Sequence, residues 1–166
     1  MTILALGQLL ADVIQNYMDV DADRVILTDE GFDAPKDSGI YILVIYDAPG
    51  LLGIDSKVNT ATNLETMSAS SHERFNVEVV SRGRDATSRH KEVLMAVQSI
   101  AGTQAAEVAG CAFFRGGNVL NLTGIEGVAS LRRYQIPIII TNVESKTDTG
   151  ALIDKFKAPT INTEAK

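Results

Sequence analysis

The chain has 166 residues, of which 45% are hydrophobic, and this size and composition are typical of one folded domain. Its net charge of −6 argues against a protein that binds nucleic acid by neutralising phosphates. Cys111 is the only cysteine, which excludes an internal disulfide. The first residues lack the basic segment of a secretory signal, and the longest apolar runs are far shorter than the roughly 20 residues of a membrane helix. We therefore expect a soluble protein made in a reducing cytosol.

The first third of the chain predicts one helix and two strands. Residues 3–18 carry a helical apolar stripe made of Ile3, Leu6, Leu10, Val13 and Tyr17. Residues 25–27 form a short strand, and residues 28–38 an exposed loop. Residues 40–46 are apolar at both alternating sets of positions, which is typical of a central strand covered on both faces.

The next segment, residues 51–71, is rich in Thr, Ser, Asn and Ala and is predicted to be a long loop. Asp-Ala-Pro-Gly at residues 47–50 ends the preceding strand in this interpretation. Three apolar residues in the loop, Leu51, Leu52 and Ile54, are predicted to pack on a neighbouring subunit or on a tube.

A clear strand pattern follows at residues 74–82, and Asp85 is predicted to cap a helix over residues 86–101. The expected apolar stripe of this helix comprises Ala86, His90, Val93, Val97 and Ile100. Gly102 stands where a glycine commonly ends a helix, and Thr103 is predicted to start a third helix that ends near Gly110.

The last third of the chain is predicted to be mostly β-structure. Residues 111–115 and 119–122 flank Gly-Gly-Asn, a hairpin turn signal. Residues 131–143 form the last strand, and Pro137 predicts that this strand lies at an edge or carries a bulge. From Glu144 onward the chain becomes polar, which predicts a tail.

The order of elements favours the α+β class, because strands and helices do not alternate along the chain. We expect a mixed, mostly antiparallel sheet packed by the N-terminal helix and a central helix pair. The domain is assigned to residues 1–150, followed by an extended C-terminal tail over residues 151–166.

One segment has the spacing of a calcium-binding loop. Asp19, Asp21, Asp23 and Glu30 have the spacing of its ligands, and the hydrophobic Ile26 lies between them. Arg24 stands where the sharp turn requires glycine, and Gly31 and Pro35 follow where the second helix should begin. We therefore interpret the segment as a solvated acidic turn and assign no metal.

No other motif indicates catalysis or a cofactor. The two histidines, His72 and His90, have no metal-ligand spacing, and Cys111 is expected to be a small buried hydrophobic residue. Four basic residues surround the second helix, namely Arg82, Arg84, Arg89 and Lys91; Arg132 and Arg133 form a second basic pair. Nucleic-acid contact is disfavoured, because no aromatic residues are interleaved for base stacking. Ion pairing between subunits and a solvated surface both remain open for these clusters, and Arg82, Arg84 and Arg89 are the candidate contacts with a neighbouring subunit or another protein of the same assembly.

The run V-x-V-x-S-x-G-x-D-A at residues 77–86, followed by a helix over Glu92-Val-Leu-Met-Ala-Val97, resembles the tail terminator and neck terminator proteins of tailed bacteriophages. Residues 133–140 are similar to the penultimate strand of that family. The long segment at residues 51–71 and the polar tail depart from the family pattern.

The resemblance implies a non-catalytic virion protein of the tail or neck, assembled in the host cytoplasm. Such proteins form a hexameric ring that caps the tail tube, ends its polymerisation and joins the tail to the head connector. In contractile phages the ring also meets the tail sheath. DNA passes through the ring without specific recognition, which suits the net negative charge.

The tail is expected to dock on a partner through Leu152, Ile153 and Phe156, because its apolar residues are too sparse to fold alone. Three alternatives remain open at the level of sequence. They are another phage neck or tail-completion protein, a small cytosolic enzyme with an unrecognised site, and a calcium-responsive adaptor.

Overall fold

The computed structural model describes residues 2–27, 37–59, 64–126 and 129–148. Its helices and short turn are α1 (Ile3–Met18), η1 (Ala22–Arg24), α2 (Asp85–Gln98) and α3 (Ile100–Val108). Its strands are β1 (Val25–Leu27), β2 (Ile40–Asn59), β3 (Leu64–Ser81), β4 (Cys111–Arg115), β5 (Leu120–Asn121), β6 (Gly124–Glu126) and β7 (Ala129–Asp148).

The seven described strands form one sheet in the order β1-β2-β3-β7-β4, with β5 and β6 also paired to β7. β1 pairs with β2 in parallel, and every other pair is antiparallel. The predicted α+β class and the mixed, mostly antiparallel sheet are confirmed.

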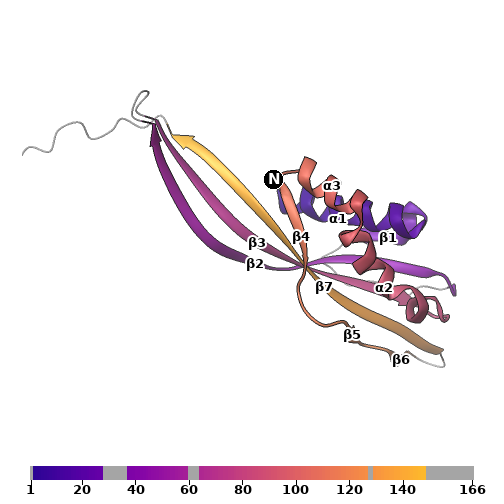
Figure 1. Cartoon of the computed structure of the whole chain (residues 1–166). Helices are drawn as coiled ribbons and strands as arrows, with labels where there is room; N and C mark the ends of the chain where they lie inside the picture. The colour runs from indigo at the N-terminus through magenta and orange to yellow at the C-terminus, as the bar shows by residue number, and fades with distance from the viewer. Residues whose placement is uncertain (1, 28–36, 60–63, 127–128, 149–166) are drawn as a thin grey trace, which may run out of the picture.

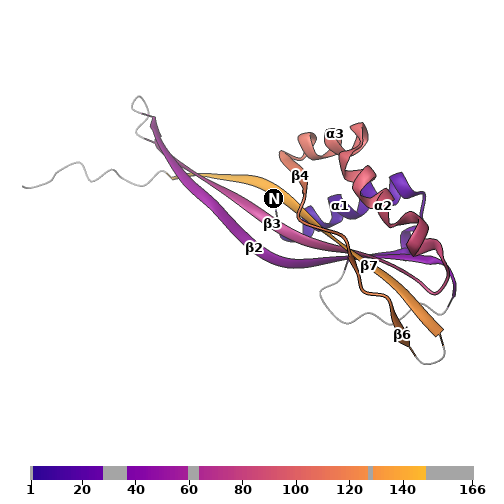
Figure 2. The same ribbon diagram turned by 60° about the horizontal axis from the view of Figure 1, so that its bottom comes forward.

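All three helices lie on one side of the sheet and cover only part of its length (Figures 1 and 2). Between helices and sheet lies a core of fully buried side chains, including Leu10, Ile14, Ile42, Phe75 and Ile138. Burying each such side chain stabilises the fold by about 1.5–3 kcal/mol. A second, smaller cluster on the opposite face joins Leu43, Val80 and Leu131, so residues 40–44 are buried on both faces as predicted.

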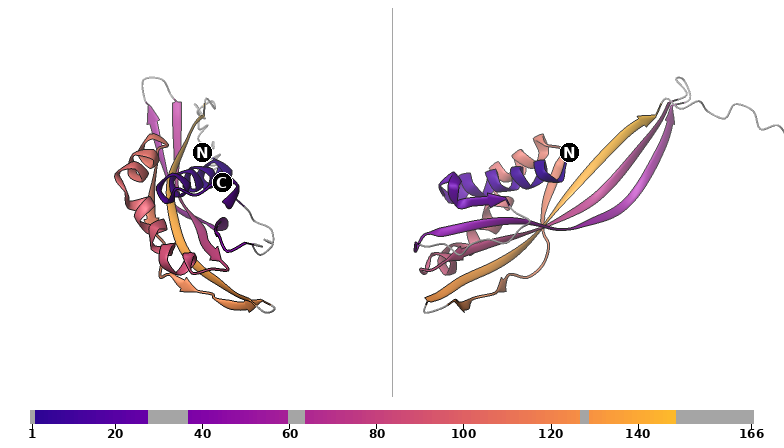
Figure 3. Two further views of the ribbon diagram at one scale, coloured as in Figure 1. Left: turned by 90° about the vertical axis from the view of Figure 1, so that its right-hand side faces the viewer. Right: turned by 180° about the vertical axis from the view of Figure 1, so that it is seen from behind.

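Beyond the helices, β2, β3 and β7 continue together as a three-stranded projection (Figures 1 and 3). We call this projection the arm and define it as residues 47–59, 64–72 and 141–148. Continuous pairing holds it together, from Ala48 opposite Arg74 to Asn59 opposite Leu64 on one side of β3. On the other side, β3 pairs with β7 out to Glu65 opposite Asp148. The helix-covered remainder of the molecule is called the body.

The arm corrects two predictions. Residues 51–71 are not a long loop, because the described parts of this segment belong to β2 and β3. Residues 47–50 do not end the first strand either. Asp47 is instead the extra residue of a register shift between Tyr46 and Ala48, and Pro49 lies on an edge strand, where a missing backbone donor is tolerated.

The helices begin and end near the predicted residues but differ in detail. The buried face of α1 is turned from the predicted stripe, since Ala11, Ile14 and Met18 are buried while Ile3 and Tyr17 are exposed. This face packs on the sheet.

In the central pair, Arg84 and not Asp85 occupies the N-cap of α2. Gly102 does not end that helix. It lies in the first turn of α3, where its N–H donates to the Ser99 hydroxyl, so Ser99 and not Thr103 caps α3. Ile100, which was expected in the apolar stripe, is 79% exposed.

The predicted hairpin of residues 111–122 is wrong, because β4 and β5 pair one after the other with β7 and not with each other. Pro137 lies between the parts of β7 that pair with β4 and with β5, because β4 ends opposite Ile138 and β5 begins opposite Gln135. The Pro137 carbonyl accepts a 2.7 Å hydrogen bond from the Gly116 N–H. β7 is therefore an inner strand whose outer neighbour is interrupted at the proline. Residues 144–148 belong to β7 and not to a tail; residues 151–166 lie outside the described residues.

Candidate assembly surface

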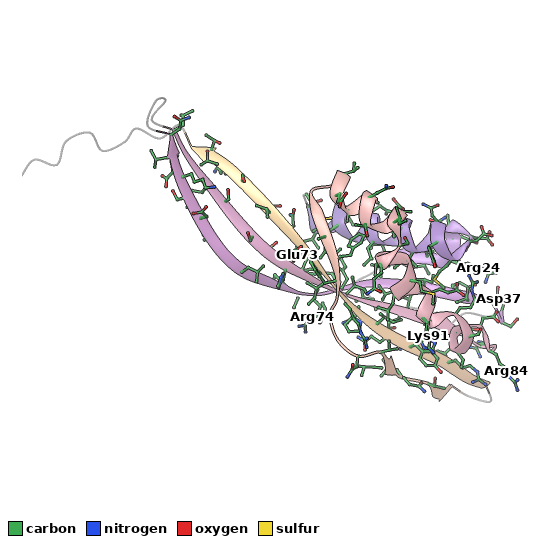
Figure 4. The ribbon with its side chains drawn as sticks, viewed as in Figure 1. Arg24, Asp37, Glu73, Arg74, Arg84 and Lys91 are labelled. Carbon is green, nitrogen blue, oxygen red and sulfur yellow. The ribbon has the colours of Figure 1, made fainter. Side chains whose placement is uncertain are left out.

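The arm begins at a buried polar pair. The Tyr46 hydroxyl donates a 2.8 Å hydrogen bond to Glu73 Oε2, and the Tyr46 ring meets the Phe75 ring edge-on at 5.4 Å. Glu73 is only 9% exposed. Burial, with the Glu73 carboxylate as a second cause, raises the pKa of Tyr46 to about 12. Figure 4 shows Glu73 and Arg74 at the root of the arm, far from Arg24, Asp37 and Arg84 at the other end of the body.

One face of the arm lies on the same side of the sheet as the helices and is called the apolar face, after the three large apolar side chains that it exposes; by register the charged residues Glu65, Glu144, Lys146 and Asp148 lie on the same face. The register assigns Ile54, Val58 and Met67 to this face, because they stand an even number of paired positions from Phe75 in the core. These three side chains are 62%, 50% and 46% exposed. Large apolar side chains grouped on an otherwise polar projection are typical of a surface that another chain covers.

The opposite face of the arm carries hydroxyl groups on β3 and β7, together with the exposed Val143. Ser68 and Ser145 are linked across β3 and β7 at 2.9 Å, and Thr66 and Thr147 at 3.1 Å. These cross-strand pairs hold the two strands in register without an apolar core. The two faces of the arm therefore differ in chemistry although they share one backbone.

An apolar cavity of about 310 Å³ opens on the helix side of the sheet where the arm leaves the body. Its lining includes Leu4 and Gly7 of α1, Leu27 of β1, and Tyr46 and Phe75 of the sheet. Leu4 is 70% exposed. Tyr46 and Phe75 belong to the same face as Ile54 and Met67, with Glu73 and Ser71 between them on β3.

A second hollow, of about 390 Å³, lies between α1 and α3. We call it the α1–α3 groove. Its walls carry Val13 and Tyr17 on one helix, and Ala101, Gly102 and Ala105 on the other. The small residues of α3 leave the groove open, and Tyr17 is 46% exposed beside it.

The predicted contact residues fall in different places. Leu52, the extra residue of a second register shift in β2, is 57% exposed, and Ile54 lies on the apolar face of the arm. The backbone of Leu51 pairs with Ser71 in the same strand pair. Leu152, Ile153 and Phe156 lie outside the described residues.

The predicted basic residues belong to the body and not to the arm. Arg89 pairs with Glu92 at 2.9 Å through Nη2, and the same nitrogen donates to the Met18 carbonyl, so Arg89 joins α2 to the end of α1. Arg84 is exposed at the start of α2, and Arg82 lies just after β3. Arg133 pairs across the sheet with the buried carboxylate of Glu78, at 2.6 Å from Nε. Sequence reasoning did not identify this ion pair, because its partners are 55 residues apart.

The segment with the calcium-like spacing has a different geometry from that of a calcium-binding helix–loop–helix. Asp19 ends α1 with a left-handed backbone, and η1 and β1 follow where a second helix would be required. Arg24 pairs with Asp37 at 2.9 Å, and this guanidinium holds the pKa of Asp37 below its usual value. Glu30 lies outside the described residues. Within residues that are described, no three His, Cys, Asp or Glu side chains gather as a metal site.

The remaining candidate side chains have structural surroundings. His72 lies on β3 opposite Gly50 and not in a loop, and the His90 ring stacks on Tyr134 at 4.3 Å. Cys111 is buried as predicted, and burial raises the pKa of its thiol.

No helix in the described part of the chain is long and apolar enough to cross a membrane. Comparison with known proteins yields no matching family model and no matching curated protein.

Proposed function

We propose that this chain is a non-catalytic structural protein of a tailed-phage virion, a tail terminator whose copies form a ring. The ring caps the tail tube, ends tail polymerisation and joins the tail to the head connector. In this proposal the chain needs no cofactor, and its partners are other copies of itself, the tail tube protein and the connector. The tail sheath is a further partner in contractile phages.

The observation that carries the proposal is the arm. The arm is an ordered three-stranded projection that none of the described helices covers, and its side chains of Ile54, Val58 and Met67 are exposed. Such a projection has no evident use in an isolated small protein. A ring requires head-to-tail contacts between different surfaces of identical subunits. A body with a groove at one place and an arm at another offers two such surfaces.

Two further features support the same function. The motif of residues 77–86 occupies the end of β3 and the start of α2, the strand-to-helix position that the terminator resemblance implies. The net charge of −6 also suits a passage through which DNA moves without adhering.

A capping assay tests this function. Purified chain is added to polymerising tail tube protein, and tube lengths and ends are imaged by electron microscopy. We expect rings at tube ends and arrested growth, whereas tubes that grow to the same length with bare ends would refute the proposal. An equal concentration of an unrelated acidic protein of similar size serves as the control.

A further inference from the structure

We propose that the apolar face of the arm packs into the α1–α3 groove of a second copy of this chain. The inference rests on the proposed ring, and it names the surfaces that hold neighbouring copies together. Ile54, Val58 and Met67 are the residues that the arm contributes, and Tyr17, Ala101 and Ala105 are those of the groove.

The arm cannot reach the groove of its own chain. β2, β3 and β7 leave the body in the direction away from the helices, and Figures 1 and 2 and the right-hand view of Figure 3 show the far ends of these strands apart from the helices. The described residues of one copy thus leave both the apolar face and the groove open. A neighbouring copy supplies the missing surface.

The size of the arm favours a ring in which every copy uses both surfaces. About nine residues per strand at roughly 3.3 Å each, in three strands about 4.8 Å apart, give one face on the order of 400 Å². A stable interface covers about 800 Å² on each partner, so a single arm supplies about half of that area. In a head-to-tail ring each copy inserts its arm into one neighbour and receives the arm of the other, so two such contacts hold every copy.

Contact through the face is favoured over pairing along the edge of the arm. The arm has two outer strands: no described strand pairs with β2 beyond Val44 on the side of β1, and β4 covers β7 only as far as Asn142. The β2 edge carries two register shifts, at Asp47 and Leu52, together with Pro49 and Lys57, and the β7 edge carries Lys146. Bulges, proline and lysine are features that hinder the addition of another strand.

The test places a negative charge on each surface and on a matched position that the contact does not use. Ile54→Asp changes the apolar face of the arm, and Ser70→Asp changes the opposite face of the adjacent strand. Ala101→Glu changes the groove, and Gln104→Glu changes another exposed position of α3. Circular dichroism and thermal unfolding establish that each variant folds.

Association is measured by analytical ultracentrifugation of the full-length chain. We expect Ile54→Asp and Ala101→Glu each to weaken association by about tenfold or more, as for residues at the centre of an interface. Ser70→Asp and Gln104→Glu should associate like the unmodified chain. Combining Ile54→Asp with Ala101→Lys should restore association, because the two charges then attract across the contact.

The outcomes separate this inference from the proposed function. If the unmodified chain forms rings and Ile54→Asp or Ala101→Glu forms them equally well, the inference is overturned and the ring stands. If association is instead lost only when residues 151–166 are removed, the tail and not the arm makes the contact, and the inference is again overturned. An unmodified chain that never associates would contradict both.

Discussion

The hydroxyl of Tyr46 donates to the carboxylate of Glu73 at 2.8 Å, at the point where the sheet passes from beneath the helices into the arm. This hydrogen bond gives the buried Glu73 carboxylate a partner at the last position of β3 that the core still covers. It also fixes the two strands that continue outward, since Tyr46 belongs to β2 and Glu73 to β3. The direction in which the arm leaves the body is therefore tied to a specific side-chain contact.

Removing the Tyr46 hydroxyl should destabilise the fold. In Tyr46→Phe the Glu73 carboxylate loses its partner while buried, which costs roughly 1–3 kcal/mol of the free energy of unfolding. Urea unfolding measures this loss. Glu73→Gln, which keeps an acceptor for the hydroxyl, should lose less, and an equal loss in both variants would show that the hydrogen bond is not the cause.

The same bond predicts a pH dependence at high pH. The pKa of Tyr46 is raised to about 12 in the folded chain, above the value of about 10 expected when unfolded. Its contribution to stability is thus complete below pH about 10 and is lost as the pH rises toward 12. Unfolding experiments across this range should show a steeper loss in the unmodified chain than in Tyr46→Phe. Parallel losses in the two proteins would contradict the assignment.

The ion pair between Glu78 and Arg133 should behave as a coupled unit. Glu78 is 4% exposed, so Arg133→Met leaves a buried carboxylate without its charged partner and should cost roughly 1–3 kcal/mol. The double variant Glu78→Met with Arg133→Met should recover part of that loss, because no buried charge remains. A double-mutant cycle by urea unfolding measures the coupling, and strictly additive losses would exclude it.

Gly102 should resist substitution although it lies in a helix. A Cβ at this position would stand 2.3 Å from the Ala96 carbonyl oxygen, a backbone atom that cannot move away freely. Gly102→Ala should therefore destabilise by about 1–3 kcal/mol, despite a gain of about 1 kcal/mol in helix propensity. Gly53→Ala is the matched control, since nothing lies within 4 Å of its added Cβ. If both variants unfold at the same urea concentration, the close approach is not important.

Truncation before residue 151 tests the predicted role of Leu152, Ile153 and Phe156. The truncated chain should keep its free energy of unfolding within about 0.5 kcal/mol, because the sequence predicts residues 151–166 to be a tail and not part of the core. Virion assembly should nevertheless fall, because the tail is expected to dock on a partner. Normal assembly by the truncated chain, scored by electron microscopy of lysates, would refute docking.

The body was largely predictable from sequence. The helical spacing of Leu6 and Leu10 marked α1, and the alternation of Phe75, Val77 and Val79 marked the buried half of β3, because both elements have one face in the core. The Gly102 prediction failed for a spatial reason. A glycine is needed at this position because the Ala96 carbonyl oxygen approaches closely, and the local sequence pattern does not show this approach.

The arm could not be predicted in the same way. Its strands contain few apolar residues, and Glu65, Ser71 and Glu73 occupy the positions of β3 that continue the face of Met67, so hydropathy gives only a weak period of two. Their structure comes from long backbone pairing of β3 with β2 and β7, over as many as 83 residues in the case of Glu65 and Asp148. Of the predicted contact residues, Ile54 lies on the apolar face of the arm in the structure. The sequence alone does not reveal this face, because it forms only when the strands pair in register.

The central claim is that copies of this chain complete one another through the arm. Mass photometry combined with negative-stain imaging of the purified full-length chain tests it most directly. We predict closed rings of several copies with a uniform mass. A single compact particle at every concentration, with no affinity for tail tubes, would contradict the claim.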